Sequence, residues 1–440
     1  MSAARPVESR LPEILEGISA PRTPDYFDDI LGQVGRTRQR PRWTFPERWI
    51  PMTALSERVA TAPRIPMRMA VALALLLLAL AVSLVLIAGS QRPSVPAPFG
   101  VAGNGQIVFV DDTGAVRVGD LDGSSTVVVP GPGHMRPVFS PDGRRLAYFQ
   151  VSGNGRTDIA VSGPHGESPL VITPTAVSKD GFFGWTPDSQ KVVVGVGRQV
   201  YAYDPTTTAL PIKLVDDITT DGFNNSITDL FRPPTGAEVL QVGYADQGTG
   251  LYRRVIATGA LIPVLTDKTS PMPLSNIASP QWSPDGQRIV FTFHPPETPD
   301  FGRAYVINAD GSGLKQVSAF EMPPSYIVDE EHTAWSPDGS RVGFMRWIMD
   351  QDGNNNVRPV VVVDVATGHE QEMSNVEVNG YGGWSWSPDG KNILEVPGGG
   401  SADEGQVIVL DATTGEFVKR TGWMADSGFP PAWQRTVPLK

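Results

Sequence analysis

The residues of this chain best suited to chemistry are its carboxylates and histidines, because the chain has no cysteine. That absence excludes disulfides, thiolate metal sites and cysteine nucleophiles. Five aspartates stand in one recurrent pattern, Ser/Thr-Pro-Asp followed by Gly or Ser. They are Asp142, Asp188, Asp285, Asp338 and Asp389. Such carboxylates could bind a metal or transfer protons, but their wide spacing would scatter them over a folded chain. We therefore interpret them as turn residues.

The histidines do not indicate a metal site either. They are spread along the chain and match no ligand spacing: His134, His165, His294, His332 and His369. The stretch DQDGNNN at residues 350–356 resembles a calcium loop, but its Gly is misplaced and Val361 occupies the position of the bidentate glutamate. We interpret it as a hairpin loop, and we predict no metal and no cofactor.

Motifs for covalent catalysis are also missing. The chain contains no Gly-x-Ser-x-Gly, no Gly-x4-Gly-Lys-Ser/Thr and no Gly-x-Gly-x-x-Gly. The sequence therefore predicts that the protein is not an enzyme, with a hydrolase-related domain as the weakest alternative.

The turn pattern belongs to a longer repeat. An aromatic residue precedes Ser/Thr-Pro-Asp at Phe139, Trp185, Trp282, Trp335 and Trp386, a degraded copy begins at Phe231, and a remnant stands at Trp433. The spacings between these aromatics are 46, 46, 51, 53, 51 and 47 residues. Each copy is followed by β-rich runs separated by Asp, Asn and Gly, such as QRIVFTF and RAYVINADG. One repeat thus supplies about four strands, which is typical of a propeller blade.

The repeats predict an all-β, seven-bladed propeller over residues 104–440. Three strands before the first repeat (GQIVFVDD, AVRVGDLDG and STVVVPG) and one after the last (PPAWQRTV) would combine into a closing blade. If the degraded Phe231 copy forms no blade, the number is six. We expect the aromatics Trp185, Trp282, Trp335 and Trp386 to pack between blades, and Asp142, Asp285, Asp338 and Asp389 to form the turns.

These repeats resemble those of TolB-type propellers, the WD40-like (PD40) repeats that also occur in the propeller domain of prolyl oligopeptidase-type peptidases. The resemblance covers residues 104–440 and implies the fold. It implies no single function, because such propellers serve many roles. It also suggests a place in the bacterial envelope, where TolB acts with partner proteins.

A binding site is expected at the mouth of the central channel, on the loops that enter the inner strands. These loops carry carboxylates, amides, aromatics and basic residues suited to a polar ligand, a cation or a protein tail, but equally to ordinary hydrated loops. The candidate residues are His134, Arg136, Asp180, Phe182, Asn225, Asn276, Glu330, Glu331, His332 and Tyr381.

A membrane span is predicted before the propeller. Residues 70–90, AVALALLLLALAVSLVLIAGS, contain no charge and are long enough for a hydrocarbon core of about 30 Å. Eight arginines between residues 36 and 68 precede the run, against Glu47 and Glu57. This bias predicts a single-pass membrane protein with a cytoplasmic N-terminus and an extracytoplasmic propeller. The predicted division is therefore 1–68 cytoplasmic, 69–90 transmembrane, 91–103 Pro-rich linker and 104–440 propeller.

The cytoplasmic segment contains two short amphipathic patterns. Their apolar faces consist of Leu11, Ile14, Leu15 and Ile18, and of Tyr26, Phe27, Ile30 and Leu31. Helices this short cannot form a core alone, so they fold onto a partner or lie on the membrane. The following Arg-, Trp- and Phe-rich stretch is best interpreted as an anchor on anionic lipid rather than a protein site or a nucleic-acid site.

These features predict a binding or sensing platform that signals to a cytoplasmic protein. The layout resembles that of membrane-bound anti-sigma factors, although a cysteine-containing zinc motif is absent. The expected partners are the lipid bilayer, a protein on the propeller and a cytoplasmic protein, but not nucleic acid, because the chain has a net charge of −11. The alternative is a structural envelope protein that does not signal.

Overall fold

The computed structural model divides the chain into two units, Met1–Arg92 and Pro93–Lys440. The residues that it describes all belong to the second unit: 97–152, 154–173, 177, 183–196, 199–215, 230–270, 276–294, 301–320, 326–350, 360–373, 383–397, 405–425 and 430–437. The predicted cytoplasmic segment, with its two apolar faces, and the predicted span lie outside these residues. Within the described ranges, no helix is long and apolar enough to cross a membrane.

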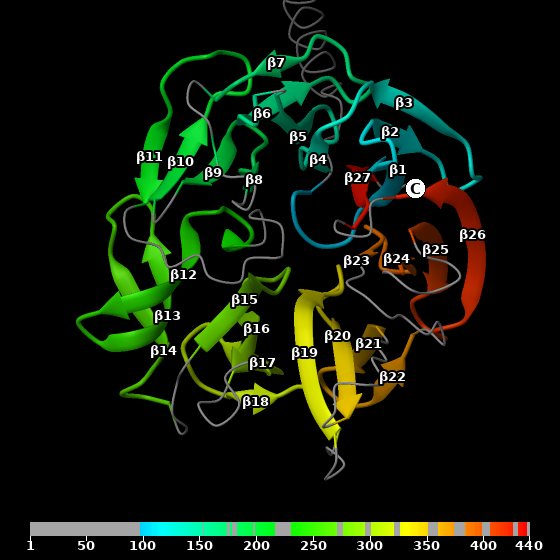
Figure 1. Cartoon of the computed structure of the whole chain (residues 1–440). Helices are drawn as coiled ribbons and strands as arrows, with labels where there is room; N and C mark the ends of the chain where they lie inside the picture. The colour runs from blue at the N-terminus through cyan, green and yellow to red at the C-terminus, as the bar shows by residue number, and fades with distance from the viewer. Residues whose placement is uncertain are drawn as a thin grey trace, which may run out of the picture. The chain divides into compact units, whose positions relative to one another are not determined.

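The described strands form seven antiparallel sheets arranged radially around a common centre (Figure 1). We number them blades 1 to 7. Blade 1 contains β4 (His134–Phe139), β5 (Leu146–Val151), β6 (Thr157–Ser162) and β7 (Leu170–Val171). Blade 2 contains β8 (Phe183–Trp185), β9 (Val192–Val196), β10 (Gln199–Tyr203) and β11 (Ile212–Val215). Blade 3 contains β12 (Glu238–Ala245), β13 (Gly248–Val255) and β14 (Leu261–Thr266).

In every blade, the first strand named is the innermost and the last is the outermost. Blade 4 contains β15 (Asn276–Trp282), β16 (Arg288–His294), β17 (Arg303–Asn308) and β18 (Lys315–Gln316). Blade 5 contains β19 (Tyr326–Trp335), β20 (Arg341–Asp350), β21 (Val360–Asp364) and β22 (Glu370–Glu372). Blade 6 contains β23 (Gly383–Trp386), β24 (Asn392–Val396), β25 (Gln406–Asp411) and β26 (Phe417–Met424). Blade 7 contains β27 (Ala432–Thr436), β1 (Gly103–Val110), β2 (Val116–Gly119) and β3 (Ser125–Val129).

Blade 7 closes the ring, as the sequence predicts. Its inner strand β27 comes from the C-terminal end of the chain and pairs antiparallel with β1, for example Ile107 opposite Trp433. The two strands lie side by side in Figure 1, β27 in red and β1 in blue. The prediction of an all-β propeller closed by both ends of the domain is confirmed.

The structure of blade 3 shows whether the propeller has seven blades or six. Its described strands form a three-stranded sheet, and Phe231 of the degraded repeat forms an isolated bridge with Val239 at the inner edge of that sheet. The degraded copy therefore has the place of an inner strand. The propeller has seven blades.

The second strand of each blade explains the apolar runs in the sequence. In β16, every residue from Ile289 to His294 is buried, and in β5 the first four residues are buried. Because a blade packs between two neighbours, both faces of its inner half are covered. These strands therefore appear as continuous apolar runs rather than as alternating ones.

The repeated turn is stabilised by its own side chains. Gly286 N donates to Ser283 O at 2.8 Å, and the Ser283 hydroxyl donates to Asp285 Oδ1 at 2.5 Å. Asp285 Oδ1 also accepts from Gln287 N at 3.0 Å. Burial alone would raise the pKa of Asp285, but these hydrogen bonds lower it below its usual value. The aspartate is thus engaged within its own turn.

The same turn carries contacts between blades. In blades 1, 4, 5 and 6, the carbonyl oxygen of the turn glycine accepts a hydrogen bond from a side chain of the preceding blade. The four pairs are Gln434–Gly143, Arg232–Gly286, Arg288–Gly339 and Arg341–Gly390, at 2.7, 3.0, 2.7 and 3.1 Å. The three arginines also lie over Trp282, Trp335 and Trp386, at 4.9, 4.7 and 5.0 Å from the ring centroids. We call each arginine–tryptophan–glycine contact a blade latch.

Two glycine-to-alanine substitutions distinguish the stability lost through backbone strain in a turn from the stability lost through crowding between blades. Gly286 and Gly368 have similar positive φ values, 67° and 74°. A Cβ at Gly286 would lie 2.5 Å from Pro233 O of blade 3, whereas a Cβ at Gly368 would meet nothing within 4 Å. We expect Gly368→Ala to lower the free energy of unfolding by about 1 kcal/mol through strain alone. Gly286→Ala should lower it clearly more, as measured by denaturant unfolding. Equal losses would show that the approach of Pro233 does not matter.

The blade latch can be tested at Arg288. Arg288→Met keeps the apolar stem of the side chain but removes the hydrogen bond to Gly339 O and the cation over Trp335. We expect the free energy of unfolding to fall by about 1–2 kcal/mol. The exposed Arg144 occupies a turn without a described side-chain contact of this kind, so Arg144→Met is the matched control and should be close to neutral. A neutral Arg288→Met would contradict the role of the latch.

Candidate functional site

Five of the ten predicted channel-mouth residues can be judged from their side chains. Asp180, Phe182, Asn225 and Tyr381 lie outside the described residues, and Asn276 begins β15 but only its backbone is described. The five described side chains belong to two inner strands. His134 and Arg136 lie on β4, and Glu330, Glu331 and His332 lie on β19.

His134 is fixed between blade 7 and blade 1. Its side chain is buried, and Nδ1 lies 2.9 Å from Gly131 O and 3.1 Å from Gly114 O. Since both neighbours are carbonyl oxygens, Nδ1 carries the hydrogen and donates. The ring also meets Tyr148 edge-on at 5.5 Å between centroids. His134 therefore takes part in the seam between blades.

Arg136 and His332 share an unusual backbone position with Ser279. All three stand three residues before the aromatic of their repeat, and all have positive φ values of 49°, 55° and 48°. Each lies where the pairing of the inner strand with the second strand shifts register by one residue. Such bulges redirect side chains and are frequent near functional sites, and left-handed non-glycine residues there store strain. This repeated bulge is the feature of the inner strands that deviates most from regular β structure.

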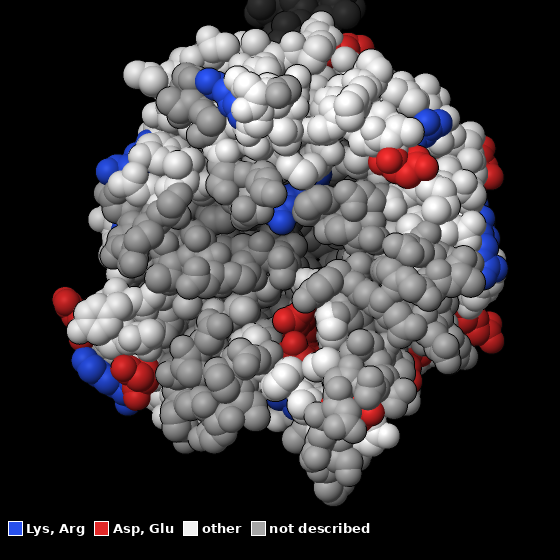
Figure 2. All heavy atoms as spheres, viewed as in Figure 1, with Lys and Arg blue, Asp and Glu red and all other residues white. Residues whose placement is uncertain are grey.

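Figure 2 shows how charge is distributed over the face seen in Figure 1. Basic and acidic side chains are scattered around its rim, and some of both signs reach the surface near its centre. Among the described side chains of this face, neither sign dominates.

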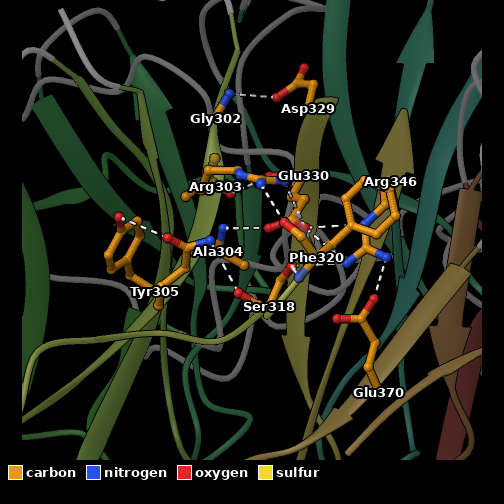
Figure 3. Close-up of polar contacts among 12 residues, drawn as sticks. Gly302, Arg303, Ala304, Tyr305, Ser318, Phe320, Asp329, Glu330, Arg346 and Glu370 are labelled. Atoms are coloured by element: carbon orange, nitrogen blue, oxygen red, sulfur yellow. Dashed lines mark hydrogen bonds and ion pairs between the residues drawn. The ribbon is translucent and has the colours of Figure 1, made fainter. Parts of the chain in front are cut away.

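The densest polar cluster lies in the seam between blades 4 and 5 (Figure 3). We call Arg303, Ser318, Glu330, Arg346 and Glu370 the seam cluster. Glu330 and Arg346 are wholly buried, and Arg346 Nη2 and Nε lie 2.9 and 3.1 Å from Glu330 Oε1. Arg303 Nη1 lies 3.3 Å from the same oxygen, and Ala304 N donates to Oε2 at 3.1 Å. Glu330 is thus surrounded by donors from both blades.

Arg346 extends the cluster toward the outer strands. It forms an ion pair with Glu370 on β22 and donates to the Ser318 hydroxyl at 2.9 Å. Its guanidinium lies over Phe320 at 4.5 Å and over Phe344 at 5.3 Å. Two acids and two arginines balance within the cluster, which is the condition under which buried charges are tolerated.

Asp329 and Glu331 flank this balanced cluster without balancing cations. Asp329 is buried, and its Oδ1 accepts from Gly302 N at 2.7 Å. Within the described part of the chain, neither Asp329 nor Glu331 forms an ion pair. Burial raises the pKa of Asp329 to about 8, and the charge and hydrogen bond of Glu331 add to the shift.

Glu330 and Glu331 are among the residues predicted from the sequence, whereas Asp329, Arg303, Arg346 and Glu370 are not. A signal was present, because Arg346 interrupts the apolar run RVGFMRWIM and three acids stand together in VDEEH. Charges inside a buried strand usually indicate a partner. The predicted role of Glu330 as an open channel-mouth residue does not fit its position, since its side chain has no exposed surface.

Across the described ranges, no group of three or more His, Asp or Glu side chains is placed to hold a metal ion. Of the calcium-like stretch, the structure describes only Asp350, at the end of β20.

Comparison with known proteins finds similarity in structure only. No protein-family model matches the sequence, and no curated protein matches it. Among solved structures, TolB from Acinetobacter baumannii is 15% identical, covers 75% of this chain and 66% of its own, and has a TM-score of 0.42. An oligogalacturonate lyase in complex with manganese is 15% identical over 72% of this chain and 85% of its own, with a TM-score of 0.49. A puromycin-hydrolysing peptidase from Mycobacterium tuberculosis is 14% identical over 76% and 57%, with a TM-score of 0.46.

These likenesses concern the fold. TolB is among the matches, as the repeats led us to expect, and the chain spans about two thirds of the TolB structure and less of the peptidase. The matches also correct one prediction. Missing motifs had suggested that the chain is not an enzyme, but the matching structures include a lyase and a peptidase. The prediction that the protein is not an enzyme is therefore wrong, because matching structures with this fold include enzymes.

The seam cluster can be tested by a double-mutant cycle. Arg346→Met leaves Glu330 buried without its main partner, and we expect the free energy of unfolding to fall by about 3–5 kcal/mol. Adding Glu330→Gln removes the orphaned charge and should recover part of that loss. Denaturant unfolding of both single variants and the double variant gives the coupling energy. Additive losses would mean that the two side chains do not act as a pair.

Proposed function

We propose that this chain is a membrane-anchored binding or sensing protein. Its propeller lies outside the cytoplasm and binds a polar ligand or a protein segment at the channel mouth. Residues 1–68 pass the bound state to a cytoplasmic protein. The observation that carries this proposal is the order of segments in the sequence: two amphipathic patterns, an arginine-rich stretch, the charge-free run of residues 70–90, and then the propeller.

The propeller supplies the support for a binding role. Each repeated aspartate accepts a hydrogen bond from the Ser or Thr hydroxyl of its own turn, so we assign these aspartates to the structure of the turns rather than to ligand binding. The inner-strand bulges place side chains of different chemistry at equivalent backbone positions: Arg136 and His332, which are partly exposed, and Ser279, which is buried. Residues that vary while their backbone position is retained suit recognition on a rigid scaffold.

The N-terminal segment supplies the support for signalling. Its two apolar faces are too short to fold alone, and a partner protein would cover them. Ligand bound to the propeller must then change how accessible these faces are to the cytoplasmic protein. This requires two conformational states of the chain that bind the ligand with different affinities. In the structural alternative, the same faces would lie on the membrane instead.

Orientation is tested first, with the full-length chain in intact cells. The propeller should be cleaved by external protease or labelled by an impermeant reagent, and residues 1–68 should be protected. Protection of the propeller would overturn the proposed topology.

Signalling is tested by substitutions in the first amphipathic segment. Ile14→Asp places a charge on the face of Leu11, Ile14, Leu15 and Ile18, whereas Glu13→Lys changes charge on the opposite face. We expect a cytoplasmic protein to be captured by in-cell crosslinking to the unaltered chain and to Glu13→Lys, with at least tenfold loss for Ile14→Asp, in line with 1.4 kcal/mol per factor of ten. Capture of envelope proteins alone would support the structural role and reject signalling.

A further inference from the structure

The residues that lead into β1 lie against the propeller, and we call residues 97–102 the strap. Arg435 on β27 holds the strap at two points, because its Nε donates to Ala97 O at 3.1 Å and its Nη2 donates to Gly100 O. A guanidinium that donates to two carbonyl oxygens restrains the backbone between them. The strap is therefore fastened to blade 7 before it continues into β1 of the same blade.

Further contacts take the strap across the ring. Phe99 packs against the apolar cluster that blades 2, 3 and 4 form. Gly100 lies near blade 5, where a Cβ would be 3.7 Å from Pro337 O, and Ala102 N donates to Pro388 O of blade 6 at 2.9 Å. In a ring of seven, blades 3 and 4 stand opposite blade 7. The strap therefore crosses the ring and returns, and it is the blue segment that curves through the middle of Figure 1.

These contacts lie at one end of the ring. Pro337 and Pro388 belong to the Ser-Pro-Asp-Gly turns that follow the inner strands of blades 5 and 6. The predicted channel-mouth loops precede the inner strands, so they lie at the opposite end. The side of Ala102 that faces the turns is fully covered, since only 1% of this residue is exposed. The strap therefore covers the turn end of the ring axis, opposite the mouth.

We propose that the strap closes the turn end, so that the ring axis is a binding site with a single entrance. This inference deepens the proposed binding role and rests on it. A ligand reaches the partly exposed Arg136 and His332 only through the mouth, and it leaves by the same opening. A polymer that threads through the ring is excluded.

The ligand class that fits such a site is the free end of a protein chain. The strap shows how the ring holds an extended backbone at the turn end: an arginine donates to its carbonyl oxygens, and a turn carbonyl accepts from its amide. At the mouth, Arg136 stands on a bulge of β4, and bulges leave backbone groups of the strand unpaired. These are the groups that recognise an extended chain end.

Thiol labelling of the full-length chain tests the closed end. The chain has no cysteine, so one introduced cysteine is its only thiol. Val101 is 51% exposed and Ala102 only 1%. We expect a charged maleimide to modify Val101→Cys at least about tenfold faster than Ala102→Cys, because the strap must open before the buried thiol reacts. Adding Phe99→Ala to Ala102→Cys should raise its rate about tenfold.

Equal rates for the two single cysteines would overturn the closed end. Because a cysteine can itself crowd the strap, hydrogen–deuterium exchange of the unaltered chain supplies a second measurement. The amide of Ala102 donates to Pro388 O and should exchange at least about tenfold more slowly than an unstructured amide. An unprotected amide would reject the strap as well.

Photo-crosslinking of the full-length chain in intact cells tests the entrance. A photoreactive label is attached to Tyr326→Cys, the exposed first residue of the inner strand β19, or to Val101→Cys at the turn end. We expect a partner protein to be crosslinked from Tyr326→Cys at least about tenfold more than from Val101→Cys, with the crosslink near a terminus of the partner. Equal crosslinking from both ends would reject the single entrance, and a crosslink to the middle of the partner would reject the chain end.

The two experiments separate this inference from the binding role beneath it. Crosslinks from neither position, together with a slowly reacting Ala102→Cys, would overturn the proposed binding of a protein while the turn end stays closed. Crosslinks from both positions, together with a fast Ala102→Cys, would leave the binding role in place and overturn the strap.

Discussion

The pairing of β27 with β1 is the constraint on which the whole ring depends. A propeller blade has two apolar faces and buries them only against two neighbours, so an open arc of blades would leave two faces exposed. Here the last strand of the chain pairs with the first and completes blade 7. Trp423 of blade 6 stacks on Phe109 at 5.0 Å and donates Nε1–H to Gly123 O at 2.9 Å, and Gln434 reaches Gly143 of blade 1. Closure therefore fixes the seams on both sides of blade 7.

The seams between blades are not chemically alike. Most of the core consists of valine, isoleucine and aromatic side chains that are fully buried between blades, as in the cluster around Phe291 and Leu240. The blade latches add a guanidinium at the ends of three seams. Only between blades 4 and 5 does the structure describe a wholly buried arginine with a wholly buried glutamate. Apolar packing does not respond to pH, whereas buried charge is sensitive to the protonation of each neighbour.

The fold was predictable because its information is local and repeated. An aromatic followed by Ser-Pro-Asp-Gly identifies a turn wherever it occurs, and even spacing converts the turns into blades. The degraded copy at Phe231 was still recognisable, and its bridge to Val239 shows why it counts as a blade. The structure describes nothing of the N-terminal segment, so the predicted topology remains a prediction.

The sequence contains the charges of the seam cluster, but which acid pairs with Arg346 was not predictable, since it depends on a bulge. Trp335 pairs with Val342 and Ala334 with Gly343. Regular continuation of that register would place Glu331 opposite Arg346. The shift between Glu331 and Ala334 instead places Glu330 opposite Arg346 and leaves Glu331 opposite Met345. One extra residue thus decides which acid stands opposite Arg346.

The bulge also connects the two features of the inner strands that deviate from the repeat. His332 occupies the left-handed position within the bulge of β19, and the register shift at that position selects Glu330 for the seam cluster. The equivalent bulges on β4 and β15 carry Arg136 and Ser279 instead. A shared backbone irregularity therefore acquires a different role in each blade according to the side chains around it. In blade 5 the register shift directs Glu330 rather than Glu331 toward Arg346, beside the place where the chain has no room for a side chain on Gly302.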